Sequence, residues 1–160
     1  MTLEQLGNIG ELIGSLGVIL SLIYLGKQIH QQNVITRAQF GASLTQRLYD
    51  RYFQSSKDET YAEFLASNWA SDSLSKTERQ RAGYAILTYL VDLFDVYDKV
   101  QSGLVDRSHL DTRISTLKLG VMNNAIAKDL WRLWKNNRDD EFIDWFEREI
   151  YKNKDQGVLS

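Results

Sequence analysis

The sequence contains no cysteine and no proline among its 160 residues, and only two histidines. The absence of cysteine excludes disulfides, thiol nucleophiles and the zinc or iron–sulfur sites that thiolates build. The absence of proline removes the commonest helix breaker, so long helices are expected. Positive charge is not in excess either: the net charge is −2, which argues against nucleic acid as a partner because phosphate binding depends on clustered positive charge.

Hydrophobic residues make up 43% of the chain and charged residues 25%, which is the composition of a globular protein rather than of a disordered one. This length suffices for one domain whose core needs no metal or disulfide. No segment shows the period of two that marks a strand. The sequence therefore predicts an all-α fold, in which an N-terminal glycine-rich helix, either a single membrane span or a buried helix, continues into a cytoplasmic bundle of four to six helices.

An uncharged, apolar stretch lies near the start of the sequence. Residues 12–26 (LIGSLGVILSLIYLG) contain no charged side chain. As a helix, the wider stretch 6–26 spans about 30 Å, which is the thickness of a bilayer's hydrocarbon core. A carboxylate at the bilayer centre costs about 2.5 to 3.5 kcal/mol, so Glu11 is expected near an interface or inside an assembly. These features predict a transmembrane helix over residues 1–26.

The flanking charges predict the orientation of this helix. Residues 27–57 carry five basic side chains, Lys27, Arg37, Arg47, Arg51 and Lys57, against Asp50 alone. By the positive-inside rule, this juxtamembrane segment lies in the cytoplasm and the N-terminus lies outside. The apolar stretch lacks a preceding basic region and a following cleavage pattern, which predicts a retained helix rather than a signal peptide. The alternative is a buried core or dimerisation helix of a soluble protein.

Small residues recur along this helix with steps of three and four, at Gly7, Gly10, Gly14, Gly17 and Ser21. Glycine inside a helix costs up to about 1 kcal/mol, so several on one face are expected where another helix packs closely. In lipid, small residues let two helix backbones approach each other. The glycine face therefore predicts a homo-oligomer or a membrane-protein partner, packed nearly parallel and left-handed.

A polar file runs beside the glycine face, through Glu4, Asn8, Glu11 and Ser15. It lies roughly 90° from the glycines around a helix. In a ring of such helices, Asn8, Glu11 and Ser15 would line a pore. The favoured interpretation places the acidic members in the outer headgroup region, where they also suit the positive end of the helix dipole.

The rest of the chain predicts five more helices. The first helix is expected to run from residue 3 to residue 53, with Gly26 and Gly41 as points where it can bend. The others are predicted over residues 60–69, 76–102, 107–120, 125–135 and 140–151. As domains, we expect a transmembrane helix over 1–26, a basic helix over 27–57, a bundle over 58–152 and a flexible tail over 153–160.

Several of these helices carry end signals. Ser75 and Glu78 form a capping box ahead of the helix over 76–102, and Gly103 suits the position just after its end. Asp106 is the predicted cap of the next helix. Asp139 or Asp140 is the predicted cap of the last one.

No constellation of residues predicts catalysis, a cofactor or a metal site. Asp92, Asp95 and Asp98 are spaced by three, but the Glu-x-x-His motifs of helical di-iron sites are missing, so these aspartates are expected to form a solvated helix face. His30 and His109 have no motif around them and are expected at the surface. The common catalytic and nucleotide-binding motifs do not occur.

Two further groups of residues are candidates for binding. Lys27 and Arg37 are candidate contacts for anionic lipid headgroups, each basic residue near the surface contributing about 1 kcal/mol. The aromatic residues near the end of the sequence are Trp131, Trp134, Trp145 and Phe146. They are expected in the core rather than in an exposed docking patch.

The order of segments resembles a family of small, uncharacterised bacterial membrane proteins. The resemblance rests mainly on residues 9–32 (IGELIGSLGVILSLIYLGKQIHQQ), and it is supported by the GLVD turn at residues 103–106 and the LWRLWKNN segment. It implies a bacterial inner-membrane location. That family has no assigned reaction, so the resemblance implies no catalytic residue.

The sequence thus predicts a membrane-anchored, noncatalytic protein that acts as an oligomeric or accessory scaffold subunit through its glycine face. Two alternatives stay open. One is an oligomeric pore lined by the polar file. The other is a soluble helical enzyme or ligand-binding protein, with a pocket between the helix that carries Tyr84 and Tyr97 and the tryptophan-rich helices.

Overall fold

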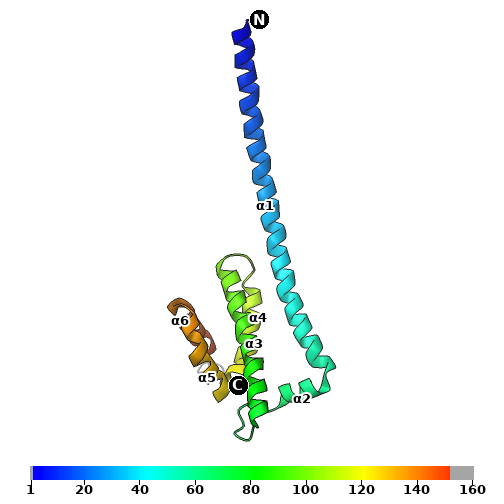
Figure 1. Ribbon diagram of the computed structural model, residues 1–160, viewed down its shortest axis with the longest axis vertical. Coiled ribbons are helices and arrows are strands. Elements are labelled where there is room, and N and C mark those ends of the chain that lie inside the picture. Colours follow the sequence, from blue (N-terminus) through cyan, green and yellow to red (C-terminus); the bar gives the residue numbers. More distant parts are fainter. Residues whose placement is uncertain (1, 152–160) are drawn as a thin grey trace, which may run out of the picture. The chain divides into compact units, whose positions relative to one another are not determined.

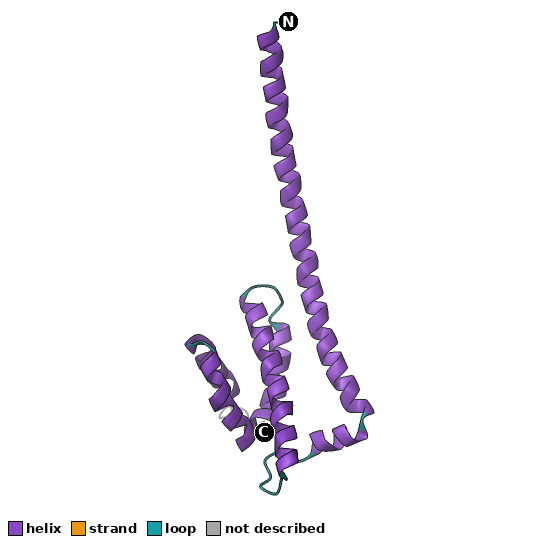
Figure 2. Ribbon diagram, in the orientation of Figure 1, coloured by secondary structure: helices purple, strands orange, loops and turns teal. Residues whose placement is uncertain are grey.

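The computed structural model describes residues 2–151, except for the side chains of residues 6 and 9. All regular structure in this part of the chain is helical, and it contains no strand (Figure 2). The elements are α1 (Leu3–Lys57), α2 (Glu59–Ala66), α3 (Lys76–Gln101), α4 (Ser108–Lys118), α5 (Ala125–Trp134) and α6 (Asp140–Ile150), with short 3-10 turns at Val121–Asn123 and Lys135–Asn137 (Figure 1). The predicted all-α class is confirmed. The predicted tail over 153–160, and residue 152 of the predicted bundle, lie outside the described residues.

The chain divides into two compact units, residues 1–40 and residues 41–160. The first unit contains the beginning of α1 and no other element. Every described side chain from Thr2 to Ile35 is exposed. The second unit contains the rest of α1 and all the other helices, so the predicted basic segment 27–57 is shared between the two units.

Local end signals fix most of the helix boundaries. The predicted capping box is present: Glu78 N–H donates to Ser75 Oγ over 3.2 Å, and Ser75 N–H donates to Glu78 Oε2 over 2.8 Å. Gly103 follows α3 with a φ of +65°, a conformation that favours glycine. Of the two candidate caps of α6, Asp139 holds the position, and its side chain accepts from Phe142 N–H over 2.8 Å. Neither Gly26 nor Gly41 interrupts α1.

The end signal of α4 differs from the prediction. Arg107, rather than Asp106, occupies the N-cap position, and it makes no side-chain capping bond. Asp106 instead accepts a hydrogen bond from Ser108 N–H over 2.8 Å in the turn before the helix. The predicted capping residue is therefore wrong by one position, because the aspartate is used in a tight turn rather than in a helix cap.

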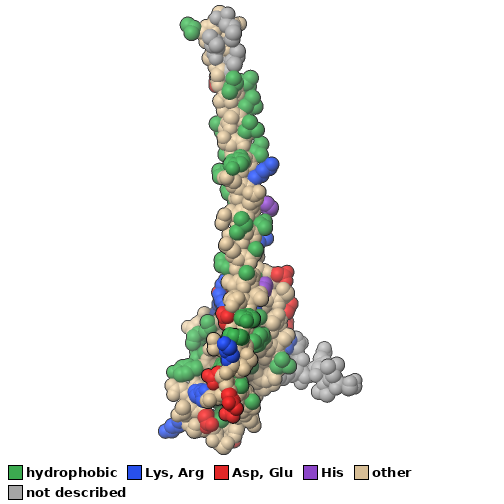
Figure 3. All heavy atoms as spheres, turned by 90° about the vertical axis from the view of Figure 1, so that its right-hand side faces the viewer, with side chains coloured by type: hydrophobic (Ala, Val, Ile, Leu, Met, Phe, Trp, Pro, Cys, Tyr) green, Lys and Arg blue, Asp and Glu red, His purple; other side chains and the backbone are tan. Residues whose placement is uncertain are grey.

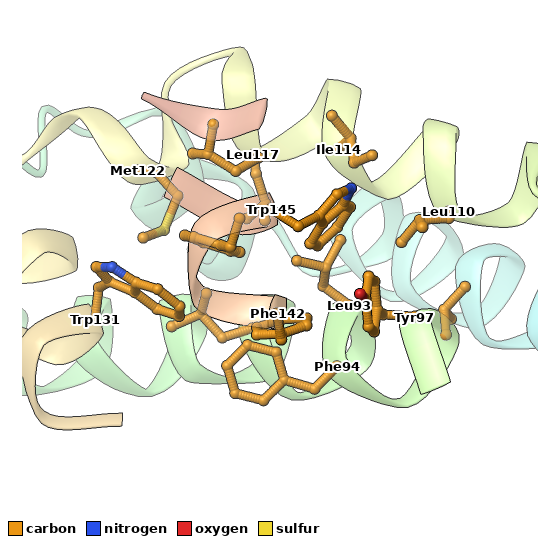
Figure 4. Packing of buried hydrophobic residues seen from close by; sticks show 14 of the residues in the cluster. Leu93, Phe94, Tyr97, Leu110, Ile114, Leu117, Met122, Trp131, Phe142 and Trp145 are labelled. Atoms are coloured by element: carbon orange, nitrogen blue, oxygen red, sulfur yellow. The ribbon is translucent and has the colours of Figure 1, made fainter. Parts of the chain in front are cut away.

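The core of the second unit is built around α3 and lined by aromatic rings (Figure 4). Phe142 of α6 is fully buried, and its ring packs nearly perpendicular to the rings of Phe94 and Tyr97, at centroid distances of 5.1 and 4.6 Å. Trp131 of α5 stacks on Phe146 with centroids 3.9 Å apart. The predicted core position is confirmed for Trp131, Trp145 and Phe146, which are buried, while Trp134 is half-buried against the same core.

The last third of α1 belongs to this core. Leu44 is fully buried, although its neighbours on α1 are mostly exposed. One turn further along, Arg47 and Arg51 project from the same side of the helix, because residues three and four apart share a helix face. This placement brings two guanidinium groups into contact with α3.

Candidate functional site

A buried carboxylate lies at the meeting point of α1, α3 and α4. The side chain of Asp92 is only 6% exposed, and Arg113 Nε donates to its Oδ2 over 2.9 Å. Arg113 is itself 3% exposed, and its other nitrogens donate to the carbonyls of His109 and Leu44 over 2.8 and 3.2 Å. The expected solvated aspartate face is therefore wrong at Asp92, which is paired in the interior.

Two arginines of α1 complete this arrangement. Arg47 Nη1 donates to Asp95 Oδ2 over 2.6 Å and lies 3.4 Å from Asp92 Oδ1, while Arg51 Nη2 lies 3.4 Å from Asp92 Oδ2. Lys99 also pairs with Asp95. We call these six residues, Arg47, Arg51, Asp92, Asp95, Lys99 and Arg113, the Asp92 cluster. Its four cations exceed its two carboxylates, so the cluster carries formal positive charge.

The pKa of Asp95 reflects both its burial and these partners. Partial burial raises this pKa, but the hydrogen bonds from Lys99 and Arg47 lower it by more, and the net pKa lies below the ordinary value. The hydrogen bond to Asp95 in turn raises the pKa of Arg47. Both groups are therefore charged at neutral pH, and the pair between α1 and α3 is a true ion pair.

Asp98 is exposed, as predicted for a solvated helix face, and it also makes an ion pair. Its carboxylate forms a two-pronged pair with Arg138, in which Nη1 donates to Oδ2 over 2.8 Å. The Arg138 guanidinium lies over the Phe142 ring, 4.2 Å from the centroid, and near the ring of Phe94 at 5.4 Å. Asp98 thus fixes a cation on the aromatic core, although about half of its own side chain stays in solvent.

A groove of about 1000 Å³ lies beside the Asp92 cluster. It is open on one side, since Tyr84 is 62% and Val91 is 48% exposed. We call it the Arg51 groove. Its lining is Arg47, Asp50, Arg51, Gln54, Tyr61, Tyr84, Ala85, Leu87, Thr88, Tyr89, Val91, Asp92, Asp95 and Trp134. The walls come from α1, α2, α3 and the end of α5.

Arg51 is the distinctive cation of this groove. It is 16% exposed, and its guanidinium lies over the Tyr89 ring at 4.6 Å from the centroid. Its 3.4 Å contact with Asp92 is its one side-chain hydrogen bond to the described residues. A guanidinium has five N–H donors, so Arg51, which lines the groove, has donors left for a ligand.

The predicted glycine face lies in the first unit. A Cβ atom built on Gly7, Gly10, Gly14 or Gly17 meets nothing within 4 Å, so no described residue covers this face. Ser21 Oγ donates to the Gly17 carbonyl over 2.8 Å, and its hydroxyl is satisfied within its own helix. The structure therefore keeps these residues on one exposed surface of α1.

The polar file is also exposed in this unit. Asn8 and Glu11 are at the surface, and Ser15 Oγ donates to the Leu12 carbonyl over 2.8 Å. Lys27 and Arg37, the candidate lipid contacts, are exposed further along α1.

The two histidines differ from each other. His30 is exposed, as expected. His109 is half-buried, and its Nε2 lies 3.4 Å from the position that a Cβ on Gly41 would occupy. The expectation of a surface histidine is wrong at His109, because α4 packs against the point of α1 where a glycine leaves room.

One helix among the described residues, α1, is long and apolar enough to cross a membrane. None of its most apolar window of 18 residues is buried, and hydrophobic side chains follow the helix in the space-filling view (Figure 3). By length and composition, this helix indicates a membrane anchor or a signal sequence.

Comparison with known proteins finds no matching family model, no matching curated protein and no matching solved structure. The resemblance to small bacterial membrane proteins therefore stays a prediction.

Proposed function

We propose that the protein is a noncatalytic scaffold or accessory subunit, anchored in the bacterial inner membrane by α1 and assembled through its glycine face. The observation that carries this proposal is the exposure of the large apolar side chains of α1. Leu12, Ile13, Leu20 and Leu22 are each more than 60% exposed. An apolar surface of this extent marks an interaction with lipid or with another protein.

The exposure of this helix favours a span over a core helix. The core helix of a soluble protein buries its apolar side chains within its own fold. In the most apolar 18-residue window of α1, by contrast, 0% of the residues are buried. Lipid is the environment that suits apolar side chains on every side of a single helix.

The glycine face supports assembly. In lipid there is no hydrophobic drive between helices, so association depends on close backbone approach and dispersion. Gly10, Gly14 and Gly17 offer that approach, because nothing in the described structure occupies the space beside them. The hydroxyl of Ser21 already bonds to its own helix and needs no polar partner in the membrane.

In this proposal Lys27 and Arg37 lie on the cytoplasmic side, near anionic lipid headgroups, and the N-terminus lies outside. The partner is a second copy of the chain or another membrane protein. The second unit is then presented to the cytoplasm.

Membrane fractionation tests the anchor. The full chain is expressed in bacteria, and the membranes are washed with alkaline carbonate. An integral protein resists this wash, whereas recovery in the soluble fraction without detergent would overturn the anchor. The detergent extract is then examined by size-exclusion chromatography with light scattering, where a defined multimer is expected.

Substitution tests the glycine face. Gly14→Leu combined with Gly17→Leu is expected to convert the multimer to monomer, because leucine side chains prevent close backbone approach. Gly26→Leu is the matched control. It also places a leucine where nothing lies within 4 Å of the glycine. At about 100° per residue, however, Gly26 lies roughly 140° around the helix from the glycine face. An unchanged mass for the double variant, or an equal loss with the control, would show that the glycine face does not hold the assembly.

A further inference from the structure

The second unit contains a cation whose hydrogen-bonding capacity is mostly unused. Arg51 makes one long contact with Asp92, at 3.4 Å, while Arg113 and Arg47 bind the carboxylates of the cluster over 2.9 and 2.6 Å. The short pairs therefore satisfy the aspartates without Arg51. Its guanidinium lies over the Tyr89 ring and Arg51 lines the groove, so its remaining N–H donors are available to a ligand there.

The walls beside this cation are aromatic and aliphatic. Four rings contribute to the lining, from Tyr61, Tyr84, Tyr89 and Trp134. Leu87 and Val91 of α3 add apolar surface between them. The exposed surface of the groove is mostly apolar, with a small number of polar and charged side chains, among them Arg51. This is the usual character of a small-molecule site, and about 1000 Å³ is large enough for a ligand of two or more rings. Flat rings pack well on such walls.

The charges around Arg51 restrict what the cation can bind. Three aspartates line the groove. Asp92 and Asp95 are paired with cations of the Asp92 cluster, whereas Asp50 accepts a hydrogen bond from the neutral amide of Gln46 over 2.8 Å. A multiply charged phosphate would be repelled by this carboxylate more strongly than a single negative charge. A carboxylate is singly charged, and its two oxygens match the planar fork of a guanidinium.

We propose that the Arg51 groove binds an aromatic monocarboxylate, with the carboxylate on Arg51 and the ring system against Tyr84 and its aromatic neighbours. This site is independent of the membrane anchor. It would give the second unit a small-molecule ligand in addition to the scaffold role.

The probe for this test is 2-naphthoate, and its matched neutral control is 2-naphthamide. Binding to the full-length protein in a neutral detergent is measured by isothermal titration calorimetry. Saturable binding of naphthoate is expected. The amide has the same ring system but no charge. Its affinity is expected to be weaker by roughly tenfold or more, because hydrogen bonds to a charged group are stronger than those to a neutral one.

Variants locate the site. Arg51→Gln is expected to weaken naphthoate binding by roughly tenfold or more, through loss of the charged donor. Tyr84→Ala is expected to weaken it several-fold, and this side chain is exposed enough for its removal to leave the fold intact. Arg132→Gln is the matched control, since Arg132 is 74% exposed on α5 and is not part of the groove lining. Circular dichroism shows whether each variant is folded.

Several outcomes would overturn the proposal. No saturable binding to the wild-type chain would do so, and so would equal affinity for the amide or equal binding by folded Arg51→Gln and Tyr84→Ala variants. If the protein self-associates, and this association is abolished by Tyr84→Ala but unchanged by naphthoate, the groove binds a second copy of the chain instead. An acidic amphipathic peptide that binds at Arg51 where naphthoate does not would assign it to a protein partner.

Discussion

At the scale of single residues, the most consequential side chain is Asp92. It is a buried carboxylate whose closest partner, Arg113, is buried more deeply still. Burying both charges is costly, and their attraction compensates only when the geometry is good and the remaining donors are satisfied. Both conditions hold here, since Arg113 also donates to the carbonyls of His109 and Leu44.

Asp92→Asn is expected to destabilise the second unit by about 3 to 5 kcal/mol, because it leaves the Arg113 guanidinium buried without its closest counter-charge. Urea unfolding followed by circular dichroism at 222 nm measures this loss. Asp111→Asn is the matched control: Asp111 is 58% exposed and pairs with Arg107 on the surface of α4, so a change within about 0.5 kcal/mol is expected.

A rescue variant separates the charge from the packing. Asp92→Leu combined with Arg113→Met removes both buried charges and keeps apolar volume, so it is expected to regain most of the stability lost by Asp92→Asn. The role assigned to this pair is wrong if Asp92→Asn costs no more than the surface control.

Sequence analysis could foresee the buried apolar residues but not these ion pairs. Helical periodicity identifies the core face of α4, where Leu110, Ile114 and Leu117 are all buried as their spacing indicates. The spacing of Asp92 and Asp95 shows only that they share a helix face. Which cations meet them depends on how α1 and α4 pack on α3, and no local signal in the sequence carries that information.

At the scale of elements, local chemistry determines where the helices begin and end. The capping box before α3, and the glycine after it, act within a few residues of the chain and were therefore readable from the sequence. The glycine face of α1 was readable for the same reason, because its spacing is a property of one helix. The Arg51 groove was not, since its walls come from several helices.

Gly83 within α3 and Gly103 just after its end give a matched pair of substitutions. Gly103→Ala is expected to cost about 1 kcal/mol, because an alanine Cβ is strained at a φ of +65°. Gly83→Ala is expected to stabilise the protein by about 0.5 to 1 kcal/mol, because alanine favours the helix interior. A Cβ on Gly83 meets only ordinary contacts, at 3.9 Å from Leu130 and 4.0 Å from Ile126.

Thermal unfolding monitored by circular dichroism compares the two glycine variants with the parent chain. The melting temperature is expected to fall for Gly103→Ala and to rise for Gly83→Ala. This difference in direction is decisive, since both substitutions add the same methyl group. Equal shifts for the two variants would contradict the assigned role of Gly103 at the helix end.

At the scale of the whole molecule, the division into units falls inside a single helix. α1 runs without interruption from Leu3 to Lys57, yet the packed unit begins at Gly41. Leu44, Arg47 and Arg51 then contribute to the core and to the Asp92 cluster. The sequence predicted domain boundaries after residues 26 and 57 and marked Gly41 only as a point where the helix can bend, because a continuous helix has no loop to mark a boundary.

Two truncated chains test where the packed unit begins. A chain of residues 41–160 is expected to be soluble and to unfold cooperatively, because it retains Leu44 and both arginines of α1. A chain of residues 58–160 is expected to be markedly less stable, since it loses a fully buried leucine and two cations that face Asp92. Urea unfolding compares them, and equal midpoints would place the start of the unit after α1.

Three of the four tryptophans, all in the second unit, have an optical consequence. Trp131 and Trp145 are 4% and 8% exposed within the aromatic core, whereas Trp134 is half-buried and lines the Arg51 groove. Core indoles emit at shorter wavelengths than those near water, so unfolding shifts the emission of the first two to the red. A ring stacked in the groove would quench Trp134 instead. Fluorescence of a Trp69→Phe variant, which removes the fourth emitter, therefore distinguishes loss of the fold from occupation of the groove.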